Sequence, residues 1–171
     1  DLLISLHPRL KRTQHIVRVD CPEDLEIISY PGAFSLIASN LLINSYIHGF
    51  ENRKQGNIKI SATKDDTHLN LEFRDNGKGI DAENIPKVFD PFFTTKEVGK
   101  GTGLGLSVSH GIIQEQGGVI DVESEVGKGS VFRLCLPVEE RISTRASRSN
   151  DEKSFEAWRS LSSWSAVAAS S

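Results

Sequence analysis

The glycine-rich run GKGTGLGL, from Gly99 to Leu106, places a glycine at every second position and leads into a stretch with helical periodicity. Glycine reaches conformations with φ > 0 and lets other groups approach the main chain closely, at an entropic cost. Three apolar residues then follow at i, i+4 and i+8: Leu104, Val108 and Ile112. We therefore expect a helix that begins near Thr102 and ends at Gly117-Gly118. A glycine loop before a helix predicts an anion site, because free N–H groups and the helix dipole face the ligand.

The run matches neither of two common phosphate-binding loops. The Walker A motif requires G-x-x-x-x-G-K-[ST], whereas Gly99-Lys100 is followed by Gly101. The dinucleotide fingerprint G-x-G-x-x-G also fails, since Gly99-x-Gly101 and Gly101-x-Gly103 each lack a glycine three residues further on. Two interpretations of the glycine run stay open: a flexible linker, or a ligand-binding loop of a different kind.

Length and composition bound the class of protein. The chain has 171 residues, enough for one domain with a core and too few for two ordinary ones. A net charge of -3 with 25% charged residues gives no general reason to expect nucleic acid or lipid as a partner. Cys21 and Cys135 lack metal-ligand spacing, which favours structural thiols in a reducing compartment.

The chain shows no sign of a membrane segment of its own. No apolar run approaches the roughly 20 residues of a membrane span, and no signal-peptide pattern is present. We expect this piece to be cytoplasmic, which leaves open a membrane anchor elsewhere in the full-length protein. Because the chain begins at Asp1 and contains no methionine, we expect it to be part of a longer protein.

Periodicity predicts an α+β two-layer sandwich, in which a mixed, mostly antiparallel sheet is covered on one face by about three helices. A long helix is expected from about Ala33 to Phe50, and the segment from Asn76 to Thr102 is mostly loop, which in a compact domain is usually functional. Six strands are expected: His15–Asp20, Leu25–Ser29, Asn57–Thr63, His68–Asp75, Val119–Ser124 and Ser130–Leu136. The domain therefore spans residues 1–137. The serine-rich residues 138–171 are expected to be a disordered tail or an added extension, the alternative being a docked helix.

Polar residues form a stripe on the otherwise apolar long helix. Asn40, Asn44 and His48 fall at i, i+4 and i+8. Buried amides without partners cost about 1–3 kcal/mol each, so this stripe needs a polar partner or solvent. Neighbouring backbone could provide that partner; amide oxygens and an imidazole also suit hydrated Mg²⁺ and phosphate oxygens.

Asp75 is the second anomaly. It shares its parity with Leu69, Leu71 and Phe73, so its carboxylate emerges on the face that packs the core. A simple Asp-Asn-Gly turn would explain this residue. The alternative is that the carboxylate holds an adenine amino group, with a flat base passing close to the following glycines.

The third anomaly is the loop sequence VFDPFFTTK, from Val88 to Lys96. Its three phenylalanines could form a small satellite core. Lys96 and Lys100 flank the glycine run, where they could meet phosphate or simply remain solvated.

The combined pattern resembles a known family. NLLINSYIH, DNGKGI, FDPFFTTK and GKGTGLGL, in this order and spacing, resemble the N, G1, F and G2 boxes of the ATP-binding catalytic domain of sensor histidine kinases. The resemblance extends over about Asp1 to Pro137 and includes the closing pattern GKGSVFRLCLP. It implies the Bergerat fold of the GHKL ATPases, with ATP and Mg²⁺ bound.

The resemblance also implies roles for individual residues. Asn44 would coordinate Mg²⁺, with Asn40 and His48 close to the phosphates. Asp75 would bind the adenine amino group in a pocket shaped by Gly77, Gly79 and Ile80, and Phe92 and Phe93 would anchor the ATP lid. The triphosphate would be approached by residues of the lid and the helix start: Lys96, Lys100, Gly101, Thr102, Gly103, Leu104, Gly105 and Leu106.

Asn40 bears on the type of reaction. Hydrolytic members of the fold carry a glutamate four residues before the metal-binding asparagine, whereas an amide cannot act as a general base near pH 7. This favours phosphoryl transfer, which needs mainly positioning and charge neutralisation. Two alternatives remain open: an ATP hydrolase with its base elsewhere, and a nucleotide-binding module without transfer activity.

The expected partners follow from the resemblance. In the family the acceptor histidine lies on a helical dimerisation domain, and a response regulator acts downstream. None of the five histidines, His7, His15, His48, His68 and His110, has the acceptor context of a histidine, an acidic residue and a later proline on a helix. We therefore expect the chain to bind ATP without phosphorylating itself. Because the dimer-forming element of the family lies upstream of the catalytic domain, we also expect a monomer.

Overall fold

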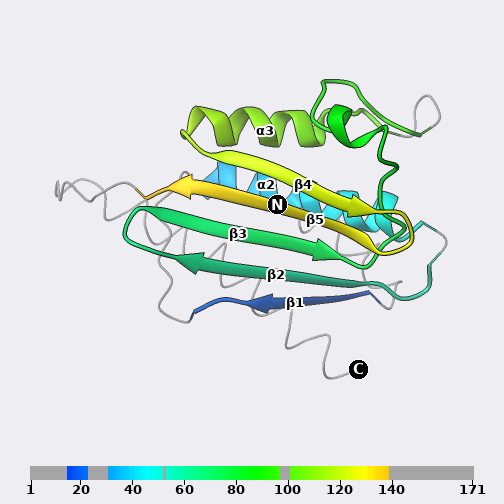
Figure 1. Ribbon diagram of the computed structural model, residues 1–171, viewed down its shortest axis with the longest axis horizontal. Helices are drawn as coiled ribbons and strands as arrows, with labels where there is room; N and C mark the ends of the chain where they lie inside the picture. The colour runs from blue at the N-terminus through cyan, green and yellow to red at the C-terminus, as the bar shows by residue number, and fades with distance from the viewer. Residues whose placement is uncertain (1–14, 23–30, 52, 97–100, 139–171) are drawn as a thin grey trace.

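The computed structural model describes residues 15–22, 31–51, 53–96 and 101–138. These residues form one five-stranded sheet with helices on one face (Figure 1). The expected two-layer α+β arrangement is confirmed, with two α-helices in the described part of the chain rather than about three. No helix within the described ranges is long and apolar enough to cross a membrane.

The strands form a mixed sheet in the order β1-β2-β3-β5-β4. Their bounds are β1 Ile16–Asp20, β2 Asn57–Lys64, β3 His68–Asp75, β4 Val119–Glu125 and β5 Gly129–Pro137. β1 pairs with β2 in parallel, and the other three pairings are antiparallel. The strand expected at Leu25–Ser29 lies outside the described residues.

The strands form because apolar residues alternate along them, which gives the sheet one buried face. One apolar row crosses all five strands at matched register positions: Val19, Ile60, Phe73, Phe132 and Val122. Ile60, Phe73 and Phe132 each keep 4% or less of their surface exposed. The helices cover this face.

The first helix changes its winding within the segment expected to be one helix. α2 runs from Pro31 to Asn44 and packs Ile37 and Leu41 into the core, each 1% exposed. A π-helical turn, η1, follows directly from Ser45 to Gly49. π-helical turns are rare and occur frequently at functional sites.

The second helix, α3, spans Gly105–Glu115 and ends at Gly117, whose φ of 71° terminates it as expected. The apolar stripe that predicted this helix is not its buried face, because Val108 is 41% exposed whereas Ser109 and Ile113 are fully buried. The small Ser109 side chain lets α3 lie close to α2, where its hydroxyl accepts a hydrogen bond from Asn40.

Between β3 and α3 the described residues are mostly loop, as expected, with one short 3₁₀ turn, η2, at Ile85–Lys87. Phe92 has a φ of 66° and its N–H donates to Gly103 O at 3.0 Å. Gly103, with φ 64°, must lack a side chain, because a Cβ there would lie 2.4 Å from the Phe92 carbonyl carbon. The two ends of the segment from Phe92 to Gly103 are thus joined just before α3.

Candidate functional site

A cavity of about 510 Å³ lies on the helix side of the sheet, bounded by α2, η1, the end of β3 and the loop before α3. Twelve of the residues expected to bind ligand line it: Asn40, Asn44, His48, Asp75, Gly79, Ile80, Phe93, Gly101, Thr102, Gly103, Gly105 and Leu106. Gly77, Lys96 and Leu104 are not among the lining residues, and Lys100 lies outside the described residues. The fold thus brings together expected site residues that are up to 66 positions apart, from Asn40 to Leu106.

Asp75 ends β3 with its carboxylate on the buried face, as its parity predicts, and is 7% exposed. Its Oδ1 accepts hydrogen bonds from the Gly77 N–H at 2.8 Å and the Ser130 N–H at 3.3 Å. Its Oδ2 accepts one from the Ser45 hydroxyl at 3.0 Å. These donors fix the carboxylate at the cavity wall, and Oδ2 retains acceptor capacity for a further donor.

The glycines after Asp75 have structural roles. Gly77 supplies a backbone donor to the carboxylate, and its Cα packs against Gly49. Gly79 has a φ of 76°, and a Cβ there would lie 2.1 Å from Glu125 O at the end of β4. Gly79 and Ile80 line the cavity, whereas Gly77 does not line it and contributes through its hydrogen bond to Asp75.

The two asparagines of α2 have different surroundings. The Asn40 side-chain amide donates to Gly105 O at 2.9 Å and to Ser109 Oγ at 3.0 Å, so it joins α2 to the start of α3. The Asn44 Nδ2 is buried and has no hydrogen-bond partner among the described residues. A buried polar atom without a partner is costly, so Asn44 is the side chain on this wall that most needs a ligand.

His48 lies on η1, one turn beyond Asn44. Burial lowers the pKa of His48 from its usual 6.5, and the nearby charges of Lys96 and Lys78 lower it further, while Glu51 opposes them. The lowered pKa favours the neutral imidazole near pH 7. Lys96 does not line the cavity, yet it is close enough to His48 to affect its ionisation.

The two phenylalanines expected to anchor the lid differ in orientation. Phe93 lines the cavity, whereas Phe92 is 72% exposed and faces solvent. Phe89, from the same loop, stacks instead on His110 of α3, with ring centroids 5.1 Å apart. The described part of the lid is held on the domain by the Phe89–His110 stacking and the Phe92–Gly103 backbone contact.

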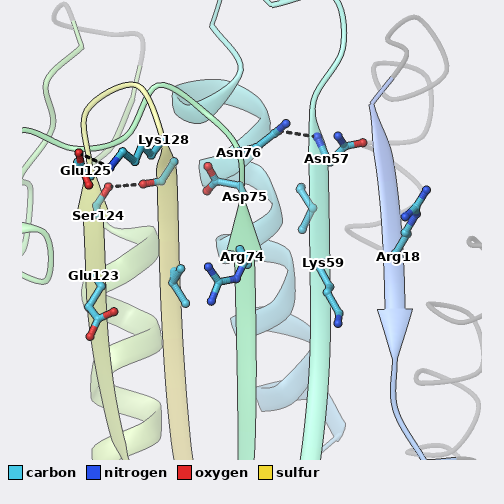
Figure 2. A pocket seen from close by; sticks show the side chains of 13 residues that line it. Arg18, Asn57, Lys59, Arg74, Asp75, Asn76, Glu123, Ser124, Glu125 and Lys128 are labelled. Atoms are coloured by element: carbon cyan, nitrogen blue, oxygen red, sulfur yellow. Dashed lines mark hydrogen bonds and ion pairs between the residues drawn. The ribbon is translucent and has the colours of Figure 1, made fainter.

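A second hollow, of about 560 Å³, lies on the opposite face of the sheet (Figure 2). Arg18, Lys59 and Arg74 lie directly opposite one another on β1, β2 and β3. Lys59 is paired with Asp20 at 2.8 Å and Arg74 with Glu72 at 3.0 Å. Asn40, Asn44 and His48 line the cavity on the other side of the sheet, so we place the candidate site there, on the helix side.

Ser45 and Lys78 are among the cavity-lining residues that the sequence analysis did not name. Ser45 is 7% exposed. A hydroxyl next to Asn44, in an otherwise apolar helical segment, is the sequence feature that could have identified it. Lys78 lies between the two glycines of DNGKGI, and its Nζ is 2.7 Å from Glu51 Oε2. No cluster of three or more His, Cys, Asp or Glu side chains suited to a metal ion occurs in the described ranges.

The chain is similar to proteins of one family. Residues 30–140 match the model of the histidine kinase-, DNA gyrase B- and HSP90-like ATPases. The sensor kinase CckA of Brucella abortus is 52% identical over 88 residues, which cover 50% of this chain and 9% of CckA. The sensor histidine kinase ZraS of Escherichia coli K12 is 42% identical over 101 residues, covering 58% of this chain and 21% of ZraS.

The solved catalytic domain of the histidine kinase ThkA is 30% identical, with a TM-score of 0.66 over 79% of this chain and 88% of ThkA's. The chain therefore spans most of a catalytic domain and less than a quarter of the length of these two curated relatives. Since the family model matches more than half of its residues, the chain belongs to the histidine kinase-, DNA gyrase B- and HSP90-like ATPase family, with the fold of histidine kinase catalytic domains.

Proposed function

We propose that the chain binds Mg-ATP in the helix-side cavity and transfers the γ-phosphoryl group to a histidine on a separate or upstream dimerisation domain. A response regulator would be the downstream partner, and the isolated chain would be monomeric. The observation that carries this proposal is the wall that joins the fixed Asp75 carboxylate to the unpartnered Asn44 amide. The cavity wall thus offers an acceptor at Asp75 and, at Asn44 Nδ2, a donor without a partner among the described residues.

Asp75 suits an adenine base. Adenine presents an amino group and no formal charge, and a buried carboxylate accepts a hydrogen bond from such a donor strongly. Because Ser45, Gly77 and Ser130 already orient the carboxylate, little reorganisation is needed when the base enters. Ile80 and Phe93 supply apolar surface for the ring in the same cavity.

The residues present fit a magnesium ion bound mainly by phosphates and water. Mg²⁺ in nucleotide sites usually takes one or two protein oxygens and keeps several waters. The candidate ligand is the side-chain oxygen of Asn44, which lines the cavity, while its buried Nδ2, without a partner among the described residues, would donate a hydrogen bond to a phosphate oxygen. When bound, the ion would neutralise phosphate charge.

The local chemistry favours transfer over rapid hydrolysis. At Asn40, the position of a hydrolytic glutamate in related ATPases, the amide is engaged by Gly105 and Ser109. Among the described residues two carboxylates line the cavity: Asp75 accepts three hydrogen bonds, and Asp81 lies on the loop beyond Ile80. The nucleophile would instead come from the acceptor domain, while the chain positions the triphosphate.

The test measures three quantities on the purified chain: ATP affinity, steady phosphate release, and transfer of γ-labelled phosphate to an added dimerisation domain, with that of ZraS as the probe. Transfer that requires Mg²⁺, with little phosphate release, supports the proposal. Steady phosphate release without an acceptor would identify a hydrolase, and ATP binding without transfer a regulatory module. If the chain does not bind ATP, the kinase, the hydrolase and the nucleotide-binding module are all excluded.

A further inference from the structure

Lys78 is the only side chain within the Gly77-Lys78-Gly79 segment, and its backbone is held from both sides. Its N–H donates to Gly49 O at 2.8 Å, and its carbonyl accepts from the Gly127 N–H at 2.7 Å. These contacts leave the side chain as the mobile part of the residue. Lys78 lines the helix-side cavity, yet its side chain remains 50% exposed.

The charged end of Lys78 is held by a residue outside the cavity lining. Its Nζ lies 2.7 Å from Glu51 Oε2, and the Glu51 side chain is 46% exposed. The hydrogen bond to Lys78, followed by the charge of Lys78, lowers the pKa of Glu51, so this carboxylate is ionised near pH 7. Such exposed ion pairs add little to stability, so exchanging Glu51 for another anion costs the fold little.

Lys78 belongs to a group of positive charges around His48. Both Lys78 and Lys96 affect the ionisation of His48, and Glu51 acts on it with the opposite sign. Asn44, with its unpartnered amide nitrogen, lies one turn before His48. A polyanion placed beside Asn44 and His48 would therefore compete directly with Glu51 for the Lys78 ammonium group.

We propose that Lys78 binds the phosphate chain of the nucleotide and that Glu51 holds Lys78 at the cavity rim until a phosphate displaces it. Glu51 is then a competitor within the chain that lowers the affinity for phosphorylated ligands and leaves that for adenosine unaffected. This inference rests on the proposed nucleotide function and adds two residues that determine phosphate affinity. From the motif DNGKGI the sequence predicts a role only for Asp75, Ile80 and the two glycines that flank Lys78, and none for Lys78 itself.

The experiment measures the affinities of ATP and adenosine for four forms of the chain: wild type, Lys78→Gln, Glu51→Gln and the double variant. Lys78→Gln should weaken ATP binding by about three- to tenfold and leave adenosine binding unchanged, as for one partly solvated charge contact. Glu51→Gln should tighten ATP binding by about two- to fivefold. In the double variant the gain from Glu51→Gln should disappear, because Glu51 acts through Lys78. Lys78→Arg should restore ATP binding.

The matched control is the ion pair between Lys59 and Asp20, which has the same type of contact at 2.8 Å and lies on the other face of the sheet. Lys59→Gln and Asp20→Asn should leave the ratio of ATP to adenosine affinity unchanged. If Lys78→Gln alters ATP and adenosine binding equally, Lys78 does not bind phosphate and the inference is wrong.

If the effect of Glu51→Gln persists without Lys78, Glu51 acts only through its general field and the exchange is refuted. Failure of the proposed function looks different, because then the wild-type chain itself would bind neither ATP nor adenosine.

Discussion

Replacing Asp75 by asparagine tests the proposed base contact with almost no change of shape. Two backbone N–H groups, of Gly77 and Ser130, point at Oδ1, so the carbonyl oxygen of the new amide must take that position. The amide NH₂ then replaces Oδ2 beside the Ser45 hydroxyl, which can accept a hydrogen bond as well as donate one. The fold should therefore survive, whereas a donor now faces the position where adenine presents its own donor.

The magnitude follows from the bond that is lost. A hydrogen bond to a charged group contributes about 1.5–3 kcal/mol, which corresponds to an affinity for ATP weaker by about 10- to 150-fold. GTP should lose less, because guanine presents a carbonyl oxygen where adenine has its amino group, and the new NH₂ can donate to it. Asp75→Asn should therefore lower the ratio of ATP to GTP affinity as well as the ATP affinity itself.

The assay is isothermal titration of ATP and of GTP, with thermal denaturation to verify that the variant is folded. The control is Asp121→Asn, which removes the same charge from an exposed position on β4. An ATP affinity within about threefold of wild type, in a folded Asp75→Asn variant, would refute the assignment of the adenine contact. A parallel loss in Asp121→Asn would attribute the effect to net charge.

Three further predictions concern the metal ligand, pH and the core. Asn44→Ala should abolish Mg²⁺-dependent phosphoryl transfer and keep part of the nucleotide binding measured without Mg²⁺; transfer at the wild-type rate would contradict the metal role. Since the pKa of His48 is lowered in the folded state, the unfolded chain takes up a proton first as pH falls below about 6.5, so this group costs stability in acid. Thermal melts from pH 7 to 5 should thus fall less steeply for His48→Gln, and equal slopes would contradict the burial argument. Ile113→Ala should lower the free energy of unfolding in urea by about 2–5 kcal/mol, because Ile113 is fully buried; a loss below about 1 kcal/mol would place it outside the core.

The sheet could be predicted from the sequence because its signal is local. Alternation at Ile58, Ile60 and Ala62 assigns these side chains to one face, and the structure buries all three to 3% exposure or less. The same parity placed Asp75 on the buried face, which is where it lies. Because side chains alternate between the two faces of a strand, knowing which face is buried determines the side on which every residue lies.

The packing of α3 could not be predicted from its own sequence. Its apolar residues at i, i+4 and i+8 predicted the helix correctly, but Val108, one of them, is 41% exposed, so they do not mark its buried face. The buried face contains Ser109, whose environment is created by Asn40, 69 positions earlier in the chain. A small polar residue is buried there because the two helices satisfy each other's hydrogen-bonding groups, and no local pattern records such a contact.

The cavity, too, could be predicted only in part, because the contacts that orient its residues are not local in sequence. Its residues come from segments that carry recognisable boxes, so the set could be expected, but the partners that orient them are distant in sequence. Ser45 meets Asp75 at the residue where the π-helical turn begins. Lys78 meets Glu51 while Gly49 and Gly127 hold its backbone. The motif thus identifies which groups can meet a nucleotide. The contacts between motifs determine how firmly each group is held before the nucleotide arrives, which is the quantity that the Asp75, Lys78 and Glu51 variants measure.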